Sequence, residues 1–432
     1  MPSPRPAETP PAFAGGVDSP YAWWRLVVSL IIGTTGGVGL WSSVVILPEV
    51  QTQFDVDRGT ASLPYTVTMV GIMAGNVVMG RLVDRFGVWV PVVVSGLSLG
   101  LGYTGAALAG NFWLYLFFQG VLIGALGSAA TFGPMIAGIS LWFRRRRGIA
   151  VALVASGSYL AGTVWPPVVT GLLDAVGWQG THLVIGAVCC AVMVPLGLAL
   201  RRPTPREVLE EAPEFSSASG ASPVPPRMLQ ALLVVAGLAC CVAMSMPQVH
   251  IVAYSVDLGL GAKSGSAALS LMLGLGVVSR IGFGVVMDRI GAVPTLLIGS
   301  ALQALCLLLY LPADAMWSLY TVSAIFGLFQ GGIVPAYAVI IRDWFPASEV
   351  GVRVGMVLSA TIGGMALGGW MSGAIFDLTL SYEAAFLNGF AWNLINLAIV
   401  LVLLWHSWEP GRVARRPVLA SVPLVGRWPG PL

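Results

Sequence analysis

One arginine inside a long apolar run is the residue of this sequence best suited to chemistry. Arg280 lies in the apolar run 266–287, eight residues before Asp288, or about 12 Å from the end of that run if it is helical. A cation in the middle of a membrane helix costs roughly 2.5–3.5 kcal/mol on insertion scales, and no Asp or Glu lies in a predicted helix interior to pair with it. Arg280 therefore either faces a wet cavity and binds an anion, or is a structural arginine bonded to backbone carbonyls.

Other polar side chains in apolar runs could line the same cavity. His250 could carry a proton or gate one mouth of the cavity, because histidine titrates near physiological pH, or it could simply end a helix at the solvent edge. Asn76 stands 204 residues before Arg280 and is expected to place a polar group across the cavity. The remaining candidate substrate-binding residues are tyrosines and a glutamine: Tyr159, Tyr254, Gln330 and Tyr337.

A glycine–aspartate–arginine pattern occurs twice, 204 residues apart. Its members are Gly80, Asp84, Arg85 and Gly87, and then Gly284, Asp288, Arg289 and Gly291. A carboxylate at a helix end can stabilise the N-terminus of a neighbouring helix, and glycine permits close helix contact and a tight turn. The pattern predicts a conformational latch between helix bundles, with an inert loop as the alternative.

Several kinds of chemistry have no signature here. The five cysteines all lie in apolar runs, where Cys behaves as a small buried hydrophobe, and no Cys-x-x-Cys or Cys/His cluster occurs. Neither a metal site nor a disulfide framework is indicated, and no nucleotide-binding motif is present. We expect no catalytic residues, no cofactor and no nucleic-acid partner.

The composition is that of a protein surrounded by lipid. Of the 432 residues 56% are hydrophobic and 9% charged, with a mean hydropathy of +0.85, whereas a soluble domain carries roughly 25% charge. The 54 glycines and 29 prolines are tolerable in membrane helices because neighbouring helices satisfy the freed backbone groups. Continuous apolar runs of about 20 residues predict helices and exclude an alternating membrane barrel.

The sequence predicts twelve membrane helices in two related halves. The latch pattern repeats after 204 residues, Trp142-Phe143 recurs at Trp344-Phe345 after 202, and Asp174 recurs at Asp377 after 203. Such offsets indicate a duplicated six-helix unit. The fold class is therefore all-α integral membrane, with two repeated six-helix bundles around a central cavity. The expected helices span 24–48, 62–83, 88–108, 112–141, 148–173, 181–200, 228–256, 266–287, 292–311, 316–341, 350–376 and 384–406.

Charge and composition predict the domains and the topology. We expect a disordered N-terminus (1–20), an N-terminal bundle (21–200), a cytoplasmic linker (201–227), a C-terminal bundle (228–408) and a cytoplasmic tail (409–432). Of the 22 Lys and Arg residues, all but Arg58, Lys263 and Arg280 fall on the side of the two termini. By the positive-inside rule that side is cytoplasmic, in a cell (inner) membrane.

Over residues 20–408 the chain resembles the major facilitator superfamily, whose best-known loop motif has the form Gly-x-x-x-Asp-Arg-x-Gly. Finer features resemble its monocarboxylate-porter and oxalate/formate-antiporter branch: Trp142-Phe143-Arg144 through Pro166-Pro167, Pro247-Gln248-Val249-His250 with Tyr254 and Asp257, and Arg280. Animal monocarboxylate porters typically place an Asp one turn before this arginine, where the present chain has Gly276.

The resemblance and the lone buried cation lead to one functional expectation. The protein is expected to be a secondary transporter that moves a small organic anion, a monocarboxylate, by alternating access with protons as the coupling ion. Its other partner is the lipid bilayer. Two alternatives stay open: an exporter of drugs or other solutes with the same fold, and a membrane sensor that binds without translocating.

Overall fold

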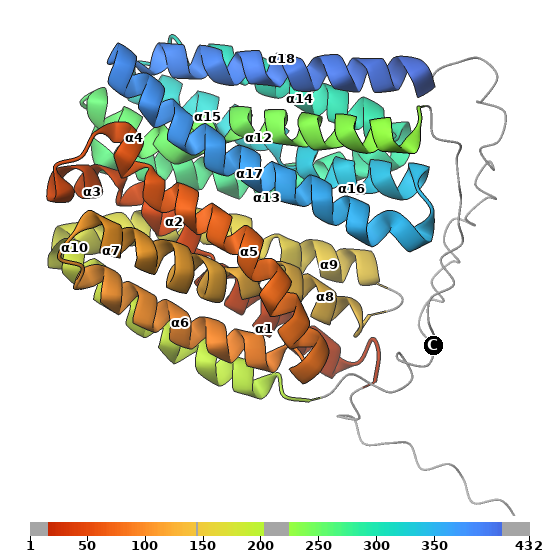
Figure 1. Ribbon diagram of the computed structural model, residues 1–432, viewed down its shortest axis with the longest axis horizontal. Helices are drawn as coiled ribbons and strands as arrows, with labels where there is room; N and C mark the ends of the chain where they lie inside the picture. The colour runs from red at the N-terminus through yellow and green to blue at the C-terminus, as the bar shows by residue number, and fades with distance from the viewer. Residues whose placement is uncertain (1–15, 144–145, 203–223, 408–432) are drawn as a thin grey trace, which may run out of the picture.

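The computed structural model describes residues 16–143, 146–202 and 224–407, and these residues are nearly all helical (Figure 1). Most of the expected N-terminus, linker and tail lie outside the described residues. The first half contains α1 (Pro20–Gly36), α2 (Val38–Val45), α3 (Leu47–Phe54), α4 (Arg58–Ala61), α5 (Leu63–Phe86), α6 (Trp89–Ala107), α7 (Phe112–Phe117), a π-helix (Phe118–Gly127), a 3₁₀-helix (Ser128–Thr131), α8 (Gly133–Ser140), α9 (Arg147–Ala155) and α10 (Gly157–Ala199).

The second half has fewer and longer helices. They are α12 (Pro226–Asp257), α13 (Gly261–Ile290), α14 (Ala292–Leu309), α15 (Met316–Gln330), α16 (Ile333–Trp344), α17 (Ala347–Thr379) and α18 (Tyr382–Ser407).

The described helices form twelve membrane spans. Eleven helical stretches are long and apolar enough to cross a membrane, and one of them, Ile149–Ala199, has 51 residues. At 1.5 Å per residue this stretch would measure about 75 Å, more than twice the thickness of a hydrocarbon core. The backbone breaks at Gly177, where φ is 71° and ψ is −177°, a conformation essentially restricted to glycine. The stretch is therefore two spans, and the twelve-helix prediction is confirmed.

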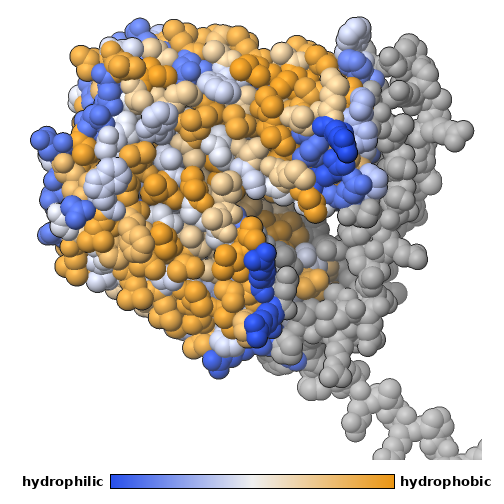
Figure 2. Space-filling model, in the orientation of Figure 1, coloured by the Kyte–Doolittle hydropathy of each residue, from blue (hydrophilic) through white to orange (hydrophobic). Residues whose placement is uncertain are grey.

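The two halves form separate six-helix bundles that lie side by side in Figure 1. We call the end at which α1 begins, α10 ends and α12 begins the linker end, and the opposite end, where α12 ends and α13 begins, the distal end (right and left in Figure 1). Hydrophobic residues cover most of the face shown in Figure 2, and hydrophilic ones gather toward the two ends. This distribution is that of a protein whose flanks face lipid and whose ends face water.

The predicted repeat is also present in the backbone. Helices α5 and α13 end at Gly87 and Gly291, with φ of 76° and 91°. The glycine N–H groups donate to the carbonyls of Val83 at 2.8 Å and Met287 at 2.9 Å. The latch glycines Gly87 and Gly291 therefore make the tight turn expected of them.

Several spans predicted as single helices are wrong in detail, because they are broken in the middle. The first span breaks at Gly37, the fourth passes through the π- and 3₁₀-helices before α8, and the tenth breaks at Gly331 and Gly332. The breaks in the fourth and tenth spans lie about one repeat length apart. Glycine lowers the cost of leaving the helical conformation, and at Gly331 it also permits close contact, since a methyl group there would lie 2.5 Å from the carbonyl oxygen of Gly276.

Candidate functional site

The distal halves of the two bundles are joined across their seam. Thr66 Oγ1 donates to the carbonyl of Ala366 at 3.1 Å, and the hydroxyl oxygens of Thr170 and Ser266 are 2.5 Å apart. At the distal surface the Lys263 ammonium lies 2.9 Å from the Asp174 carboxylate. These contacts join α5 to α17 and α10 to α13, and they close the distal end.

The linker halves of the bundles are open toward each other. Arg280 donates across the seam to the carbonyl of Ala155, nearer to the linker end than the contacts of Thr66, Thr170 and Lys263. Four glycines on α5, α13 and α17 toward this end would accept a methyl group with nothing within 4 Å of it: Gly80, Gly284, Gly355 and Gly363. Figure 2 shows a hollow between the bundles toward the same end. The structure is therefore open at the linker end and closed at the distal end.

Arg280 lies where the closed half meets the open half. Its Nη1 donates to the carbonyl of Ala155 at 2.9 Å in the other bundle, and its Nε donates to the carbonyl of Gly331 at 3.4 Å. The guanidinium carbon lies 4.4 Å from the ring centroid of Tyr159. The ion pairs found among the described residues do not include Arg280, so its positive charge is met there by carbonyl dipoles and a ring face.

The position of Tyr159 depends on a missing side chain. A methyl group at Gly276 would lie 2.5 Å from Cε1 of Tyr159, so the ring occupies the space that a larger residue would fill. Gly276 is the position at which the resembling porters carry an Asp. In this chain the face of Tyr159 covers the guanidinium instead, and a cation–π contact adds attraction without cancelling the charge.

Two predicted cavity residues have buried polar atoms without partners. Gln330 is 1% exposed; its Oε1 accepts a hydrogen bond from Gln248 Nε2 at 2.5 Å, while its own Nε2 has no partner. Exchanging O and N in both amides reverses this bond and leaves Gln330 Oε1, instead of its Nε2, buried without a partner. Asn76 Oδ1 is likewise buried without a partner. Gln330 directly precedes the carbonyl group of Gly331 that Arg280 contacts.

Three other predicted cavity residues are bound elsewhere, within the C-terminal bundle. The Tyr337 hydroxyl donates to Asn396 Oδ1 at 2.8 Å, and the Tyr254 hydroxyl donates to the carbonyl of Ala313 at 3.1 Å. His250 lies toward the distal end, with Nε2 2.7 Å from the carbonyl oxygen of Gly369. None of these contacts is to Arg280: Tyr337 anchors α16 to α18, Tyr254 anchors a distal turn, and His250 belongs to a network described next.

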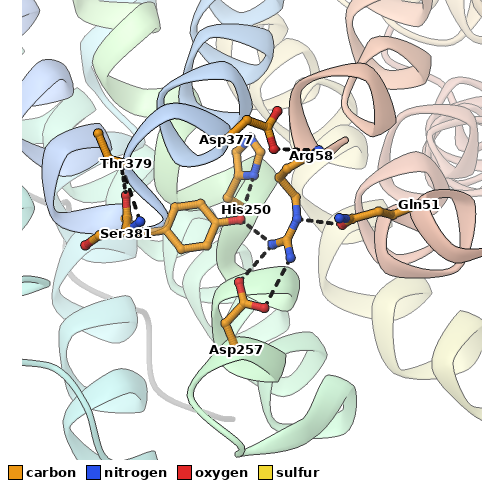
Figure 3. A network of polar contacts seen from close by, with 8 residues as sticks. Gln51, Arg58, His250, Asp257, Asp377, Thr379 and Ser381 are labelled. Carbon is orange, nitrogen blue, oxygen red and sulfur yellow. Dashed lines mark hydrogen bonds and ion pairs between the residues drawn. The ribbon is translucent and has the colours of Figure 1, made fainter. Parts of the chain in front are cut away.

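A polar network centred on Arg58 links the bundles at the distal end (Figure 3). Its guanidinium makes two bonds to the Asp257 carboxylate, at 2.9 and 3.1 Å, and one to the Tyr382 hydroxyl at 2.7 Å. The backbone N–H groups of Arg58 and Gly59 donate to the Asp377 carboxylate at 2.8 and 2.6 Å. The Tyr382 hydroxyl lies 3.1 Å from His250 Nδ1.

Sequence reasoning did not assign this network. Arg58, Tyr382 and Gln51, whose Oε1 accepts from Arg58 Nε at 2.7 Å, were not recognised as site residues, and neither was Gln248 beside Gln330. Two signals were available: Arg58 is one of only two basic residues predicted on its side of the membrane, and Asp377 repeats Asp174.

The latch residues are apart in this conformation. A close helix contact was expected at Gly80, but a methyl group there would meet nothing within 4 Å, and the same is true of Gly284. Arg85, Asp288 and Arg289 are exposed, and the side chain of Asp84 lies outside what the structure describes. The open space at Gly80 and Gly284 is consistent with the open linker end.

No ligand is suggested by clustering of metal-binding side chains. Among residues 16–143, 146–202 and 224–407, no three His, Cys, Asp or Glu side chains are grouped so that they could hold a metal ion.

Comparisons with known proteins agree with this architecture. The bovine monocarboxylate transporter 13 is 26% identical over 392 residues, which cover 88% of this chain and 89% of the relative. An MFS-type transporter of Penicillium oxalicum, opdF, is 29% identical over 290 residues, 67% of each chain. The crystal structure of a bacterial homologue of the human lysosomal transporter Spinster, in an inward-facing and occupied conformation, has a TM-score of 0.66 at 14% identity and covers 91% of this chain and 99% of that one.

A family model covers nearly the whole helical region. The model of the Major Facilitator Superfamily matches residues 29–313 and 281–422. Together with the twelve spans and the two repeated bundles, this match shows that the chain belongs to the major facilitator superfamily of membrane transporters.

Proposed function

We propose that this transporter moves a small organic anion, a monocarboxylate, across a cell membrane by alternating access, with protons as the coupling ion. The substrate is bound at the base of the linker-end hollow by Arg280, with Tyr159, Gln330 and Asn76 around it. The linker end is the cytoplasmic end in this proposal.

The observation that carries the proposal is the uncompensated charge of Arg280. A half-buried cation within a membrane span is costly without an acidic partner, and the carbonyls of Ala155 and Gly331 supply only partial negative charge. A carboxylate entering from the open linker end would supply a full one. Its two oxygens match the planar donor fork of a guanidinium, which favours a carboxylate over a spherical anion.

The unpaired amides support a substrate that has polar atoms beyond its charge. Leaving a buried donor or acceptor unsatisfied costs about 1–3 kcal/mol, so the free NH₂ of Gln330 and the free Oδ1 of Asn76 call for a partner. A bound molecule with oxygen or nitrogen atoms near these positions would provide one.

The asymmetric closure supports alternating access. One end of the seam is held by side-chain contacts while the other is open, as expected for one of the two states of a rocking pair of bundles. The opposite state requires the distal contacts to break and the linker halves to approach. The latch motifs around Gly87 and Gly291 lie where that approach would occur.

Relatives support the substrate class. The bovine protein named above and human monocarboxylate transporter 11, which is 25% identical and covers 90% of this chain, carry that activity in their names.

The test is transport by the purified full-length protein in liposomes. A panel of labelled short-chain monocarboxylates, dicarboxylates, sugars and organic cations is offered with and without a pH gradient. We expect uptake of one or more monocarboxylates, accelerated by an inward proton gradient. Flux confined to cations or neutral solutes would instead support the exporter alternative, and binding without any flux would support the sensor.

A further inference from the structure

We propose that His250 is a proton-binding site, and that a proton bound there replaces the charge of Arg58 and opens the distal end. The inference rests on the proposed function only in taking the distal end to open and close during transport.

The hydrogen-bond partners of His250 define its protonation state in the closed form. The carbonyl of Gly369 can only accept, so the Nε2 atom 2.7 Å from it carries a hydrogen. In a neutral imidazole Nδ1 is then an acceptor, and it receives the Tyr382 hydroxyl at 3.1 Å. The hydroxyl oxygen in turn accepts from Arg58 Nη1 at 2.7 Å. Every donor in this chain, which runs from Arg58 through Tyr382 and His250 to Gly369, faces an acceptor.

A proton on Nδ1 of His250 disrupts this chain of hydrogen bonds. Nδ1–H would point at the Tyr382 oxygen that already accepts from Arg58, and the hydroxyl hydrogen would lose its acceptor. Two cations would then share one neutral oxygen at a place where His250 is fully buried and Arg58 is 7% exposed. Unpaired donors and like charges are both costly in such surroundings. Protonation is therefore incompatible with the closed arrangement.

The surrounding charges favour protonation of His250 once the bundles separate and Arg58 no longer contacts this region. Asp257 on α12, Asp377 on α17 and Tyr382 on α18 contact Arg58 or His250 from the C-terminal bundle, and the ring of Tyr254 on α12 packs against Tyr382. Arg58, at the start of α4, is the cation contributed by the N-terminal bundle. When the bundles separate, both carboxylates stay with His250 and lose Arg58 as their partner. An imidazolium then supplies the missing positive charge, so the proton and Arg58 compete for one acidic site.

The tyrosine on the other side of the seam adds no charge. The ring of Tyr65 on α5 packs against α17, where a methyl group at Gly369 would lie 3.0 Å from it, and its buried hydroxyl has no partner. The competition therefore involves one guanidinium, one imidazole and two carboxylates. Acid on the distal side stabilises the distal-open state, and the proton must leave His250 before Arg58 can return.

The experiment measures the distal opening without any substrate. Spin labels are placed at Gln53 and Asp314, which are exposed at the distal ends of the two bundles, in full-length protein whose five native cysteines have been replaced, in lipid nanodiscs. The ratio of distal-open to distal-closed molecules should rise as pH falls from 8 to 5.5, by up to about tenfold per pH unit, the limit for one linked proton.

The variants separate His250 from other titrating groups. His250→Gln should make the ratio independent of pH, whereas His182→Gln, at the other fully buried histidine, should leave the wild-type dependence intact. Arg58→Gln should be distal-open already at pH 8, because the competitor is gone. A wild-type distance that does not change with pH overturns the proposal, as does a pH dependence that survives in His250→Gln. Failure of monocarboxylate uptake would overturn the proposed function but not this result.

Discussion

Asp174 and Asp377 occupy equivalent positions in the two repeats, and each carboxylate crosses the seam to the beginning of a span in the other bundle. Asp377 accepts hydrogen bonds from the backbone of Arg58 and Gly59, whereas Asp174 pairs with Lys263. The two sites differ in exposure. The Arg58 and Asp257 side chains are 8% and 32% exposed, but those of Lys263 and Asp174 are 80% and 56% exposed. Solvent screens the Lys263–Asp174 pair, so the contacts around Arg58 hold the distal end closed.

The difference in exposure predicts that removing the charge of Arg58 and that of Lys263 will have unequal effects. Arg58→Gln should increase hydrogen exchange on the order of tenfold or more in the segments 58–66 and 366–380, since tenfold corresponds to only about 1.4 kcal/mol of opening free energy. Lys263→Gln, the matched control, should leave exchange nearly unchanged. Hydrogen–deuterium exchange with mass spectrometry measures exchange in both variants. Equal protection in the two would show that the exposed Lys263–Asp174 pair holds the distal end as strongly as the Arg58 contacts do.

Two glycines of the first latch motif should differ in their effect on stability: Gly87, which follows the end of α5, and Gly80, which lies inside it. Gly87→Ala should destabilise the protein by about 1–3 kcal/mol, because its backbone lies in a region that other residues rarely adopt. Gly80→Ala should be neutral or stabilising by up to about 1 kcal/mol, since it is helical with open space around it. Thermal unfolding of the purified variants compares them, and a Gly80→Ala protein that melts below Gly87→Ala would contradict the assignment.

The unpaired amide of Gln330 predicts a loss of affinity without a loss of stability. In the double variant Gln248→Leu, Gln330→Leu both amides are removed, so no buried partner is orphaned. We expect a melting temperature no lower than that of the wild type, and a KM for uptake raised about tenfold if the substrate lost one hydrogen bond of about 1.4 kcal/mol.

The control for this pair is another buried glutamine of the same bundle. Gln303 donates through Nε2 to the carbonyl of Cys240 at 3.1 Å, and its Oε1 lies 3.6 Å from the Cys240 thiol. Gln303→Leu should lower the melting temperature and leave KM unchanged. The reverse pattern, with KM altered only in Gln303→Leu, would show that Gln330 does not contact the substrate.

The charge asymmetry predicts that both termini are cytoplasmic. A reporter that is active only in the cytoplasm, fused after Leu432 or inserted at residue 216, should be active at both positions. A silent reporter at either position in a normally expressed protein would reverse or break the proposed topology.

The overall architecture could be predicted because it depends on local sequence patterns. Apolar runs, basic loops and motifs recurring at 202–204 residues each depend on neighbouring residues or on duplication, so twelve spans and two bundles follow from the sequence. The breaks inside spans could not be placed, because most glycines here allow either a helix or a break and packing decides which. At Gly331 the decision comes from the approach of Gly276, 55 residues earlier.

The site was predicted only in part for a related reason. Arg280 was found because a lone cation in an apolar run is unusual, and Gln330 and Asn76 because they are polar. The acceptors that Arg280 uses are the backbone carbonyls of Ala155 and Gly331, and a backbone carbonyl has no signature in the sequence. Arg58 and Asp377 are 319 residues apart, and nothing in either neighbourhood indicates the other. Tyr337 and Tyr254 were named for their polarity alone, which does not show which face of a helix a residue occupies, and both hydroxyls bind within the C-terminal bundle.

The most direct test of the account compares Arg280→Gln with wild type in two measurements on the same preparation: melting temperature without substrate, and monocarboxylate uptake per folded molecule. Gln keeps a polar side chain but removes a half-buried charge from a membrane span, so the empty protein should be at least as stable as the wild type. Uptake should fall by more than tenfold, because losing a hydrogen-bonded charged partner typically costs about 2–5 kcal/mol. Arg342→Gln, at an exposed arginine, should change neither. A destabilised Arg280→Gln protein with wild-type uptake would contradict the account and make Arg280 a structural residue.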